Sequence, residues 1–322
     1  ELGKAIPIDN VMYFFGKGNK ALRIRANAIA AAQEDVFYKN AIKRIPQIYI
    51  EYFDEIIKGI PLVSPEKKSF HVHLPCLYNK FILALYVEHG ARLYWYQHGA
   101  FYGEVLGAGH NLEGRLADEF RSWGWKIGAN HRPWKAYRLE YYAKQYRAAP
   151  NEKKYDVLVA FPQLHEAVEL FYRERITYFL QNISREKYHR FLARPRPLNK
   201  VFSHAHLLNY IKKDERVVID SGLTPMPSLI AASRLVIQLS VPATSFLECI
   251  YTDHPTIGIL QNKAPTEIIK PYYKFFLEEG VLHPDIESLV NHLNKIDIET
   301  WWSQLVSHPV YQEFKHNFAR KV

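Results

Sequence analysis

Short apolar segments alternate with helical ones through the second half of the chain, and this alternation constrains the fold more than any other feature. A strand that is apolar along its whole length is buried on both faces, as in parallel sheets covered by helices. Strands separated by helical segments favour parallel βαβ units. The predicted strands are YDVLVAFP (155–162), the apolar part of YHRFLARPRP (188–197), RVVID (216–220), RLVIQLS (234–240) and PTIGIL (255–260).

Helical patterns fill the intervals between these strands, and two aromatic-rich helices close the chain. The intervening helices are expected at 166–183, 204–213, 225–233 and 244–252, and the closing ones at 285–296 and 300–321. The second half is therefore predicted to form a doubly wound parallel sheet, which binds its ligands at the carboxyl ends of the strands.

The first half shows the same signals more sparsely. FHVHLPCL (70–77) and RLYWYQHG (92–99) are typical of strands, with a helix over 79–90 between them. A charged helix followed by Pro150 and a polar cluster indicates a linker near 148–154. Because single cores stop growing at roughly 250–300 residues, we predict two domains, 1–150 and 151–322. The predicted fold class is α/β with two Rossmann-like domains.

The formal net charge of +9 favours an anionic partner. Nucleic acid, anionic lipid and an acidic small substrate all fit this charge. We expect no nucleic acid, because the sequence shows no zinc finger, RNP-type strand or long basic run. Basic residues are instead spread through aromatic helices, a pattern that fits a peripheral membrane face or a cleft for phosphorylated and carboxylated ligands.

Hydropathy bears on localisation. No apolar run reaches the roughly 18–20 residues that span a bilayer, and the first residues lack the layout of a signal peptide. We therefore expect a cytoplasmic protein that contacts the inner membrane peripherally.

A histidine, a glutamate and several glycines follow the second predicted strand, in YWYQHGAFYGEVLGAG (94–109). Backbone and side chains can converge at a glycine-rich strand end, which makes this loop a candidate site. His98 is the candidate base, since the unperturbed pKa of histidine is about 6.5. Glu104 and Asp118 are candidates for a base or a nucleophile, although Asp118 also fits a surface salt bridge.

A second candidate site lies where the strand 234–240 turns into a helix. Ser240, Thr244 and Ser245 fall at this turn, where free backbone N–H groups and the positive helix end favour a phosphate. Glu248 follows one turn later and could accept hydrogen bonds from ribose hydroxyls. The alternative is that Thr244 or Ser245 simply caps the helix.

These motifs carry a resemblance to a known family. The segment 233–260 resembles the C-terminal half of GT-B glycosyltransferases. QHGAFYGE (97–104) and the later SWGW (122–125) resemble a group of bacterial surface-carbohydrate transferases with an HG-x-x-YG element. That group is related to the Kdo transferases of lipopolysaccharide and capsule synthesis, which use CMP-linked donors. The resemblance covers roughly residues 92–126 and 216–260.

The resemblance implies a GT-B fold whose last helices cross back onto the first domain. It implies that residues 1–150 take the acceptor and residues 151–322 take the nucleotide sugar, with Glu248 on the ribose. Two departures concern mechanism: Gln97-His98-Gly99 replaces an acidic-Gly-Phe motif, and the Arg-x-His-Pro element is present only as Arg194-Pro195-Arg196-Pro197. The resemblance therefore assigns no nucleophilic carboxylate to the position of Gln97-His98-Gly99.

Charged groups suit the leaving phosphate of such a donor. Arg194 and Arg196 could stabilise the negative charge that builds there, or could form a solvated basic loop. Asp220 ends the strand 216–220 and Ser221 follows it. Both could bind the donor, and Asp220 could also serve catalysis. The alternative for Asp220 is an Asx-type turn before Gly222.

We expect no metal site and no cofactor apart from the CMP-sugar donor itself. His71 and His73 point the same way on one strand, but no third ligand stands at a suitable spacing. The sequence thus predicts a metal-independent glycosyltransferase moving Kdo or a nonulosonate from CMP to a lipopolysaccharide or other surface glycan, including lipid-linked ones. The alternatives are a UDP-, GDP- or dTDP-sugar or CDP-polyol donor, or a noncatalytic glycan- or nucleotide-binding subunit.

Overall fold

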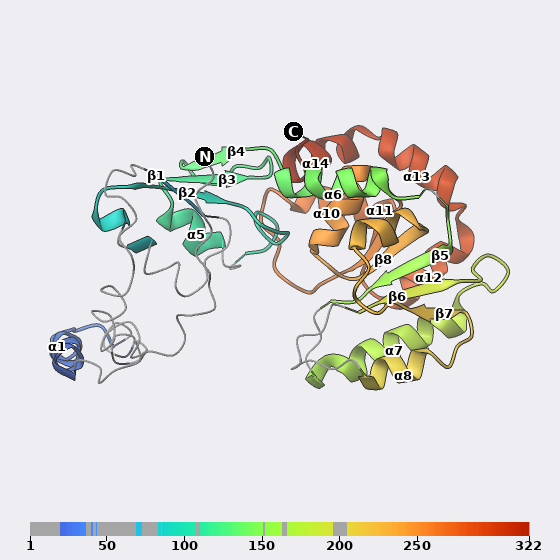
Figure 1. The fold of residues 1–322 in the computed structure, drawn as a ribbon, viewed down its shortest axis with the longest axis horizontal. Coiled ribbons are helices and arrows are strands. Elements are labelled where there is room, and N and C mark those ends of the chain that lie inside the picture. Colours follow the sequence, from blue (N-terminus) through green and yellow to red (C-terminus); the bar gives the residue numbers. More distant parts are fainter. Residues whose placement is uncertain are drawn as a thin grey trace. The chain divides into compact units, whose positions relative to one another are not determined.

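The computed structural model describes residues 20–36, 40, 43, 69–72, 83–84, 86–106, 110–150, 152–162, 166–195 and 205–321. The chain forms two compact units, Glu1–Tyr94 and Trp95–Val322 (Figure 1). In the first unit the described elements are α1 (Lys20–Ala31), β1 (Ser69–Val72) and the start of β2 (Arg92–Tyr96). The predicted boundary near residue 150 falls inside the second unit, between a helix and a strand, and it stays a prediction.

The larger sheet belongs to the second unit and has the strand order β10-β9-β8-β5-β6-β7. Every pairing in it is parallel. Its strands are β5 (Tyr155–Ala160), β6 (Phe191–Arg194), β7 (Val217–Ile219), β8 (Ser233–Val241), β9 (Thr256–Leu260) and β10 (Leu282–His283). Five of these six were expected from the apolar segments of the sequence, and the two-residue β10 was too short to be recognised.

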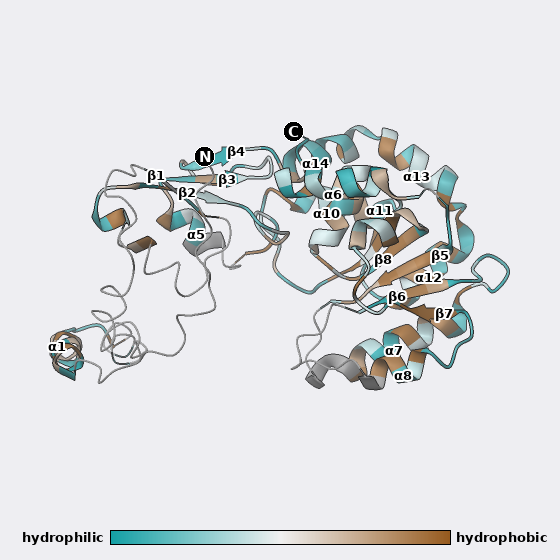
Figure 2. Ribbon diagram, in the orientation of Figure 1, coloured by the Kyte–Doolittle hydropathy of each residue, from teal (hydrophilic) through white to brown (hydrophobic). Residues whose placement is uncertain are grey.

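Helices cover both faces of this sheet, as burial on both sides requires. Along β5, Val157 and Val159 pack into one core cluster, whereas Leu158 and Ala160 pack into another. The first cluster includes α7 (Glu166–Asn182), α8 (Ala205–Ile211) and α12 (Ile286–Lys295), and the second includes α9 (Met226–Ala231) and α10 (Thr244–Thr252). In Figure 2 much of β6 and of β8 carries the hydrophobic colour.

The helix α6 (Tyr137–Ala148) runs along the outside of α10. Tyr251 of α10 donates a hydrogen bond to Glu140 of α6 at 2.6 Å, and the Tyr146 hydroxyl lies 3.1 Å from His254 Nδ1. These contacts pack α6 against the end of α10 and the turn that precedes β9.

The closing helices are α11 (Lys270–Glu278), α13 (Ile298–Ser307) and α14 (Pro309–Phe318). Directly after α14, the backbone N–H of Arg320 donates to the Trp123 carbonyl at 3.0 Å. A Cβ on Gly124 would lie 2.5 Å from the carbonyl oxygen of His316, so the chain packs closely there. The prediction that the last helices return to the N-terminal half of the sequence is confirmed, although 300–321 is two helices rather than one.

The smaller sheet has the order β1-β2-β3-β4, with β3 (Glu119–Ser122) and β4 (His131–Pro133) paired in parallel. The helix α5 (His110–Leu116) precedes β3. Neither β3 nor β4 was predicted, because EFRS and HRP carry too few apolar residues to indicate a strand. Of the predicted strand 70–77, residues 73–77 lie outside the described part of the chain. None of the described helices is long and apolar enough to span a membrane.

Candidate functional site

The carboxyl ends of β5, β6, β8 and β9 surround a cavity of about 560 Å³. The strands β5 and β8 are neighbours in the middle of the sheet. The strand that follows β5 lies on one side of this pair, as β6, and the strand that follows β8 lies on the other side, as β9. Such a switch point opens a crevice, and open α/β sheets bind ligands there. The polar lining of the cavity includes Arg138, Tyr142, Arg194, Gln238, Ser240, Thr244, Ser245, Glu248 and Gln261.

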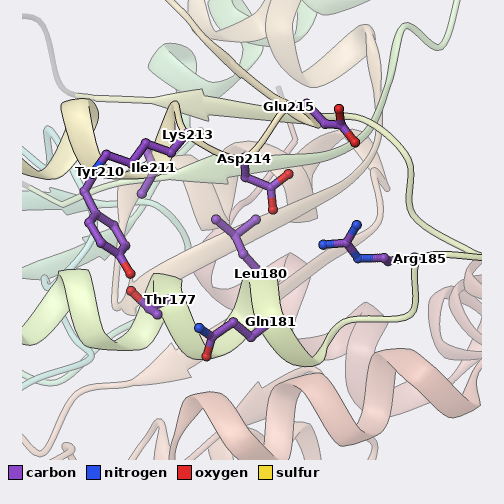
Figure 3. A pocket seen from close by; sticks show the side chains of 9 residues that line it. All are labelled: Thr177, Leu180, Gln181, Arg185, Tyr210, Ile211, Lys213, Asp214 and Glu215. Atoms are coloured by element: carbon purple, nitrogen blue, oxygen red, sulfur yellow. The ribbon is translucent and has the colours of Figure 1, made fainter.

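A second hollow, of about 390 Å³, lies at the opposite edge of the same sheet. Figure 3 shows its lining, with Thr177 and Gln181 on α7 and Tyr210 at the end of α8. Asp214 and Glu215 come just before β7, so this hollow borders the amino end of a strand. Ligands of parallel sheets bind at the carboxyl edge, and we therefore assign the candidate site to the larger cavity.

Three predicted donor-binding residues line that cavity around the start of α10. Ser245 Oγ donates a hydrogen bond to Gln238 Oε1 at 2.8 Å, and Ser240 Oγ accepts one from Gln261 Nε2. Thr244 Oγ1 accepts from the backbone N–H of Ala100 at 3.2 Å. The start of α10 is thus surrounded by oriented polar groups.

The N-cap of α10 is Ala243, which makes no side-chain capping hydrogen bond. The alternative interpretation of Thr244 or Ser245 as the helix cap is therefore wrong. The first N–H groups of a helix have no partner one turn earlier. Here the N-cap side chain does not cap them, and Phe246 N–H bonds back to the Ala243 carbonyl at 3.1 Å. They meet the cavity at the positive end of the helix dipole.

Arg194 and Asp220 form a buried ion pair beside the cavity. Their residues are 9% and 8% exposed, and Arg194 Nη1 donates to Asp220 Oδ2. Asp220 Oδ2 also accepts the Gly222 N–H at 2.7 Å, so the Asx-type turn is present as well. Arg194 lines the cavity and Asp220 does not. Asp220 is connected to the cavity only by its ion pair with Arg194.

Glu248 lies one turn into α10 and lines the cavity at 8% exposure. Burial raises the pKa of its carboxyl to about 7, and the positive charge of Arg138 opposes that rise. A carboxyl with this pKa accepts hydrogen bonds in its ionised form above neutral pH and donates one in its protonated form below it.

Gln97 joins the two sequence motifs that carry the resemblance. Its Oε1 accepts the Trp123 backbone N–H at 2.8 Å and the Trp125 indole N–H at 2.9 Å. Its Nε2 donates to the Gly99 carbonyl at 2.9 Å. The side chain is 4% exposed, so it holds the glycine-rich loop against the SWGW segment from inside the core. Trp123 and Trp125 are both 3% exposed and serve packing.

The loop 97–106 touches the cavity wall directly. A Cβ on Gly99 would lie 3.1 Å from Thr244 Oγ1, and Phe101 lines the cavity. Arg138 of α6 donates to the His98 carbonyl at 2.5 Å. The structure therefore brings the two candidate sites of the sequence together through Gly99, Ala100 and Phe101.

His98 belongs to a hydrogen-bonded chain of three side chains. Its Nδ1 lies 2.8 Å from the Tyr102 hydroxyl, and that hydroxyl donates to Glu113 Oε2 at 2.5 Å. The pKa of Tyr102 is raised by burial and by Glu113. Since Tyr102 uses its proton toward Glu113, its oxygen accepts the proton of a His98 nitrogen.

Glu104 lies away from the cavity lining and is 1% exposed. Its Oε2 accepts from the Tyr273 hydroxyl at 2.7 Å, and Oε1 has no hydrogen-bond partner among the described residues. Burial raises the pKa of this carboxyl to about 7 despite the hydrogen bonds from Tyr273 and the Phe101 backbone. Thr266 closes over the loop, since its Oγ1 donates to the Gly103 carbonyl at 2.5 Å.

Two other predicted residues do not reach the cavity. Asp118 is exposed between α5 and β3, and Ser221 is exposed beyond β7, where its Oγ accepts the Leu223 N–H at 3.4 Å. Neither lines the cavity. Arg196 lies outside the described residues.

Sequence reasoning missed Arg138, Tyr142, Gln238 and Gln261, which also line the cavity. The two residues of α6 belong to a helix that was recognised only as basic and aromatic, and its packing against α10 was not predictable from its own pattern. Gln238 and Gln261 did carry a signal, because each is an amide in or just after an apolar strand.

Among the described residues, no group of three or more His, Cys, Asp and Glu side chains could hold a metal ion. His71 stacks on Tyr94 with ring centroids 4.9 Å apart, and His73 lies outside the described part. The prediction of metal-independent chemistry stays a prediction.

The sequence matches a model of the LIC12162 family of transferases over residues 17–322. The chain belongs to this transferase family. The match extends through both halves of the sequence, including all cavity-lining residues named above. A comparison with curated proteins finds no match.

Solved structures resemble this family member at low sequence identity. A Listeria monocytogenes protein described as a UDP-N-acetylglucosamine 2-epimerase is 15% identical, with a TM-score of 0.50 over 84% of this chain and 75% of its own. Anabaena HepE in complex with UDP and glucose is 13% identical, with a TM-score of 0.47 over 84% and 78%. The wall teichoic acid polymerase TagF is 13% identical, with a TM-score of 0.42 over 78% and 68%.

The likeness to the Listeria protein concerns the fold alone. It agrees with the α/β class and the two Rossmann-like sheets predicted from the sequence, and that prediction is confirmed.

Proposed function

We propose that this transferase is a glycosyltransferase that binds a nucleotide-sugar donor in the switch-point cavity. The observation that carries the proposal is the start of α10, which opens without a side-chain cap into a cavity of about 560 Å³ at the carboxyl edge of the sheet. Helix N-termini and switch points are where nucleotides bind in such folds.

The negative charge of the donor phosphate determines where the nucleotide lies in this proposal. Its phosphate lies at the start of α10 against Thr244 and Ser245, where the first N–H groups of the helix favour an anion. Glu248, one turn later, accepts hydrogen bonds from ribose hydroxyls. Arg194 and Arg138 both line the cavity, and their charges stabilise the phosphate as it leaves the anomeric carbon.

His98 takes the proton of the acceptor hydroxyl in this proposal. Tyr102 receives the N–H of one ring nitrogen, which in a neutral imidazole makes the other nitrogen the proton acceptor. Arg138 ties the His98 carbonyl to the cavity wall. None of His98, Glu104 and Asp118 is part of the cavity lining. The base role goes to His98 because Arg138, which lines the cavity, holds its backbone carbonyl.

We further propose that the donor is a CMP-linked acidic sugar, Kdo or a nonulosonate, and that the acceptor is a surface glycan. The support is the resemblance over residues 92–126 and 216–260, and the net charge of +9, which suits an anionic donor and a lipid-linked acceptor. A UDP-sugar is the alternative, favoured by the name of the Listeria protein of the same fold. Membership of a transferase family favours a catalytic protein over a binding subunit.

Thermal unfolding with CMP, UMP, GMP and dTMP tests the donor. A ligand that binds only the folded state raises the free energy of unfolding by RT ln(1 + [L]/Kd). We expect the largest rise in melting temperature with CMP. A larger rise with UMP would replace the donor by a UDP-sugar, and no rise with any nucleotide would contradict the donor site. Release of nucleotide on adding acceptor distinguishes transfer from binding alone.

A further inference from the structure

Gln238 is an amide in the middle of an apolar strand. It lies on β8 with apolar neighbours on either side, next to Ala160 of β5 and Gly258 of β9 in the strand register. Its residue is 2% exposed, and it lines the switch-point cavity. Central strands of parallel sheets are normally apolar throughout, so this amide needs an explanation.

The amide is held in one orientation. Ser245 Oγ donates to its Oε1 at 2.8 Å, and its Nε2 has no hydrogen-bond partner among the described residues. A buried donor without a partner costs about 1–3 kcal/mol, and such groups are rare in folded proteins. Ser245 holds the amide oxygen, and the Nε2 atom is buried beside the cavity that Gln238 lines.

The backbone around Gln238 leaves room for this side chain. A Cβ on Gly258 would lie 3.4 Å from Gln238 Cβ and 2.4 Å from Val241 Cγ2. The pairing of β8 with β9 also shifts register between Gln238 and Val241. Only glycine on β9 permits this close approach, which keeps Gln238 at the carboxyl edge beside the start of α10.

Two independent sets of donors thus meet at one place. The first is the start of α10, a nine-residue helix whose N-cap Ala243 provides no side-chain acceptor. The second is the unpartnered Nε2 of Gln238. The N-cap side chain offers no acceptor to the start of α10, and Gln238 Nε2 has no partner among the described residues. An anion rich in oxygen acceptors would satisfy both.

We propose that Gln238 Nε2 donates a hydrogen bond to the phosphate of the nucleotide donor, with Ser245 as the positioning residue that orients the amide. This inference rests on the proposed function and adds to it the residue that recognises the phosphate from the sheet side. The amide is neutral, so it recognises acceptor oxygens without adding to the positive charge of the site.

The experiment measures the binding of CMP and UMP, and of cytidine and uridine, by calorimetry on the full chain. Gln238→Leu keeps the approximate size and removes the donor, and Gln238→Glu replaces it by an acceptor that repels phosphate. We expect Gln238→Leu to weaken nucleotide binding about tenfold and nucleoside binding less than about twofold. Gln238→Glu should weaken nucleotide binding further.

Gln181→Leu is the matched control. Gln181 is a glutamine on α7 that lines the hollow at the opposite edge of the sheet (Figure 3), and its replacement should leave both affinities unchanged. Melting temperatures without ligand show whether each variant folds. If Gln238→Leu does not fold, Ser245→Ala serves as the second variant and should give a smaller loss for nucleotides alone.

The outcomes are distinct. Equal losses for nucleotide and nucleoside, or no loss in Gln238→Leu, would overturn the assignment of Gln238 while leaving the donor site in place. A wild-type protein that binds none of the four ligands would overturn both the donor site and this assignment.

Discussion

Glu104 and Glu248 allow a comparison of two regions, the glycine-rich loop 97–106 and the segment 240–248. Burial raises the pKa of each carboxyl to about 7. Glu248 and Arg138 both line the cavity. Glu104 instead bonds to the Tyr273 hydroxyl, and Thr266 bonds to the neighbouring Gly103 carbonyl. A perturbed pKa marks a candidate site only in combination with space for a ligand. The loop is thus a packed wall, and the segment 240–248 is the proposed binding surface.

The largest expected effect concerns the binding side of this comparison. Asp220→Ala leaves the buried guanidinium of Arg194 without its carboxylate, and breaking a buried pair in this way costs about 3–5 kcal/mol. Chemical denaturation should show this loss in the free energy of unfolding. The double variant Arg194→Met with Asp220→Ala should recover part of it, and equal stability of the two variants would contradict a coupled pair.

The loop side is tested by Gly103→Ala. Gly103 has φ +75°, and a Cβ there would lie 2.6 Å from the Trp125 ring. We expect a loss of roughly 2–4 kcal/mol in the free energy of unfolding. Gly90→Ala is the matched control, because Gly90 has φ +79° with no atom within 4 Å of the added Cβ among the described residues, and it should lose about 1 kcal/mol. Similar losses at both positions would mean that the loop is not packed against Trp125.

The two carboxyls should behave alike in their effect on stability. Each has a folded pKa of about 7 above its ordinary value of 4.5, so the folded state holds the proton more tightly. The contribution of the raised pKa to the free energy of unfolding is fully present below about pH 4.5 and is lost as the pH rises toward 7. Relative to wild type, the free energy of unfolding of Glu104→Gln and of Glu248→Gln should each rise by roughly 1–3 kcal/mol between about pH 4.5 and 7. Denaturation curves at pH 4.5 and 8 check the sign.

Ligand binding should separate the two carboxyls. Glu248→Gln removes the ribose acceptor in the proposed site and should weaken binding of the preferred nucleotide about tenfold at pH 8, since a charge-assisted hydrogen bond is lost. Glu104→Gln should change that affinity by less than about twofold, because Glu104 does not line the cavity. A loss of binding in both variants would show that the loop takes part in nucleotide recognition.

The smallest effect is expected from Tyr273→Phe. The Tyr273 hydroxyl donates to Glu104 and opposes the rise of the carboxyl pKa. Its removal should raise the pKa of Glu104 further and cost about 1 kcal/mol at pH 8. The loss should shrink at pH 4.5, where Glu104 is protonated. A loss that does not vary with pH would mean that the hydroxyl acts on packing rather than on the charge.

Part of the candidate site was predictable from the sequence. Ser240, Thr244, Ser245 and Glu248 were assigned because an apolar strand followed by a helix places them at a carboxyl edge, and all four line the cavity. Gln97 and the SWGW segment were recognised as motifs, but the hydrogen bonds that join them depend on contacts between distant parts of the chain. Arg138 could not be assigned, because nothing in the pattern of α6 indicates which strand edge it faces.

The sequence by itself determined which segments become strands and helices of the parallel sheet, because the period and length of apolar runs decide local structure. It also determined the glycines at which the chain turns tightly. Only the tertiary structure decided which of the polar residues share a cavity: Glu248 does and Glu104 does not, although both are glutamates near the end of a strand. The physical reason is that burial and access depend on what packs from elsewhere in the chain, here Tyr273 over one carboxyl and an open strand edge beside the other.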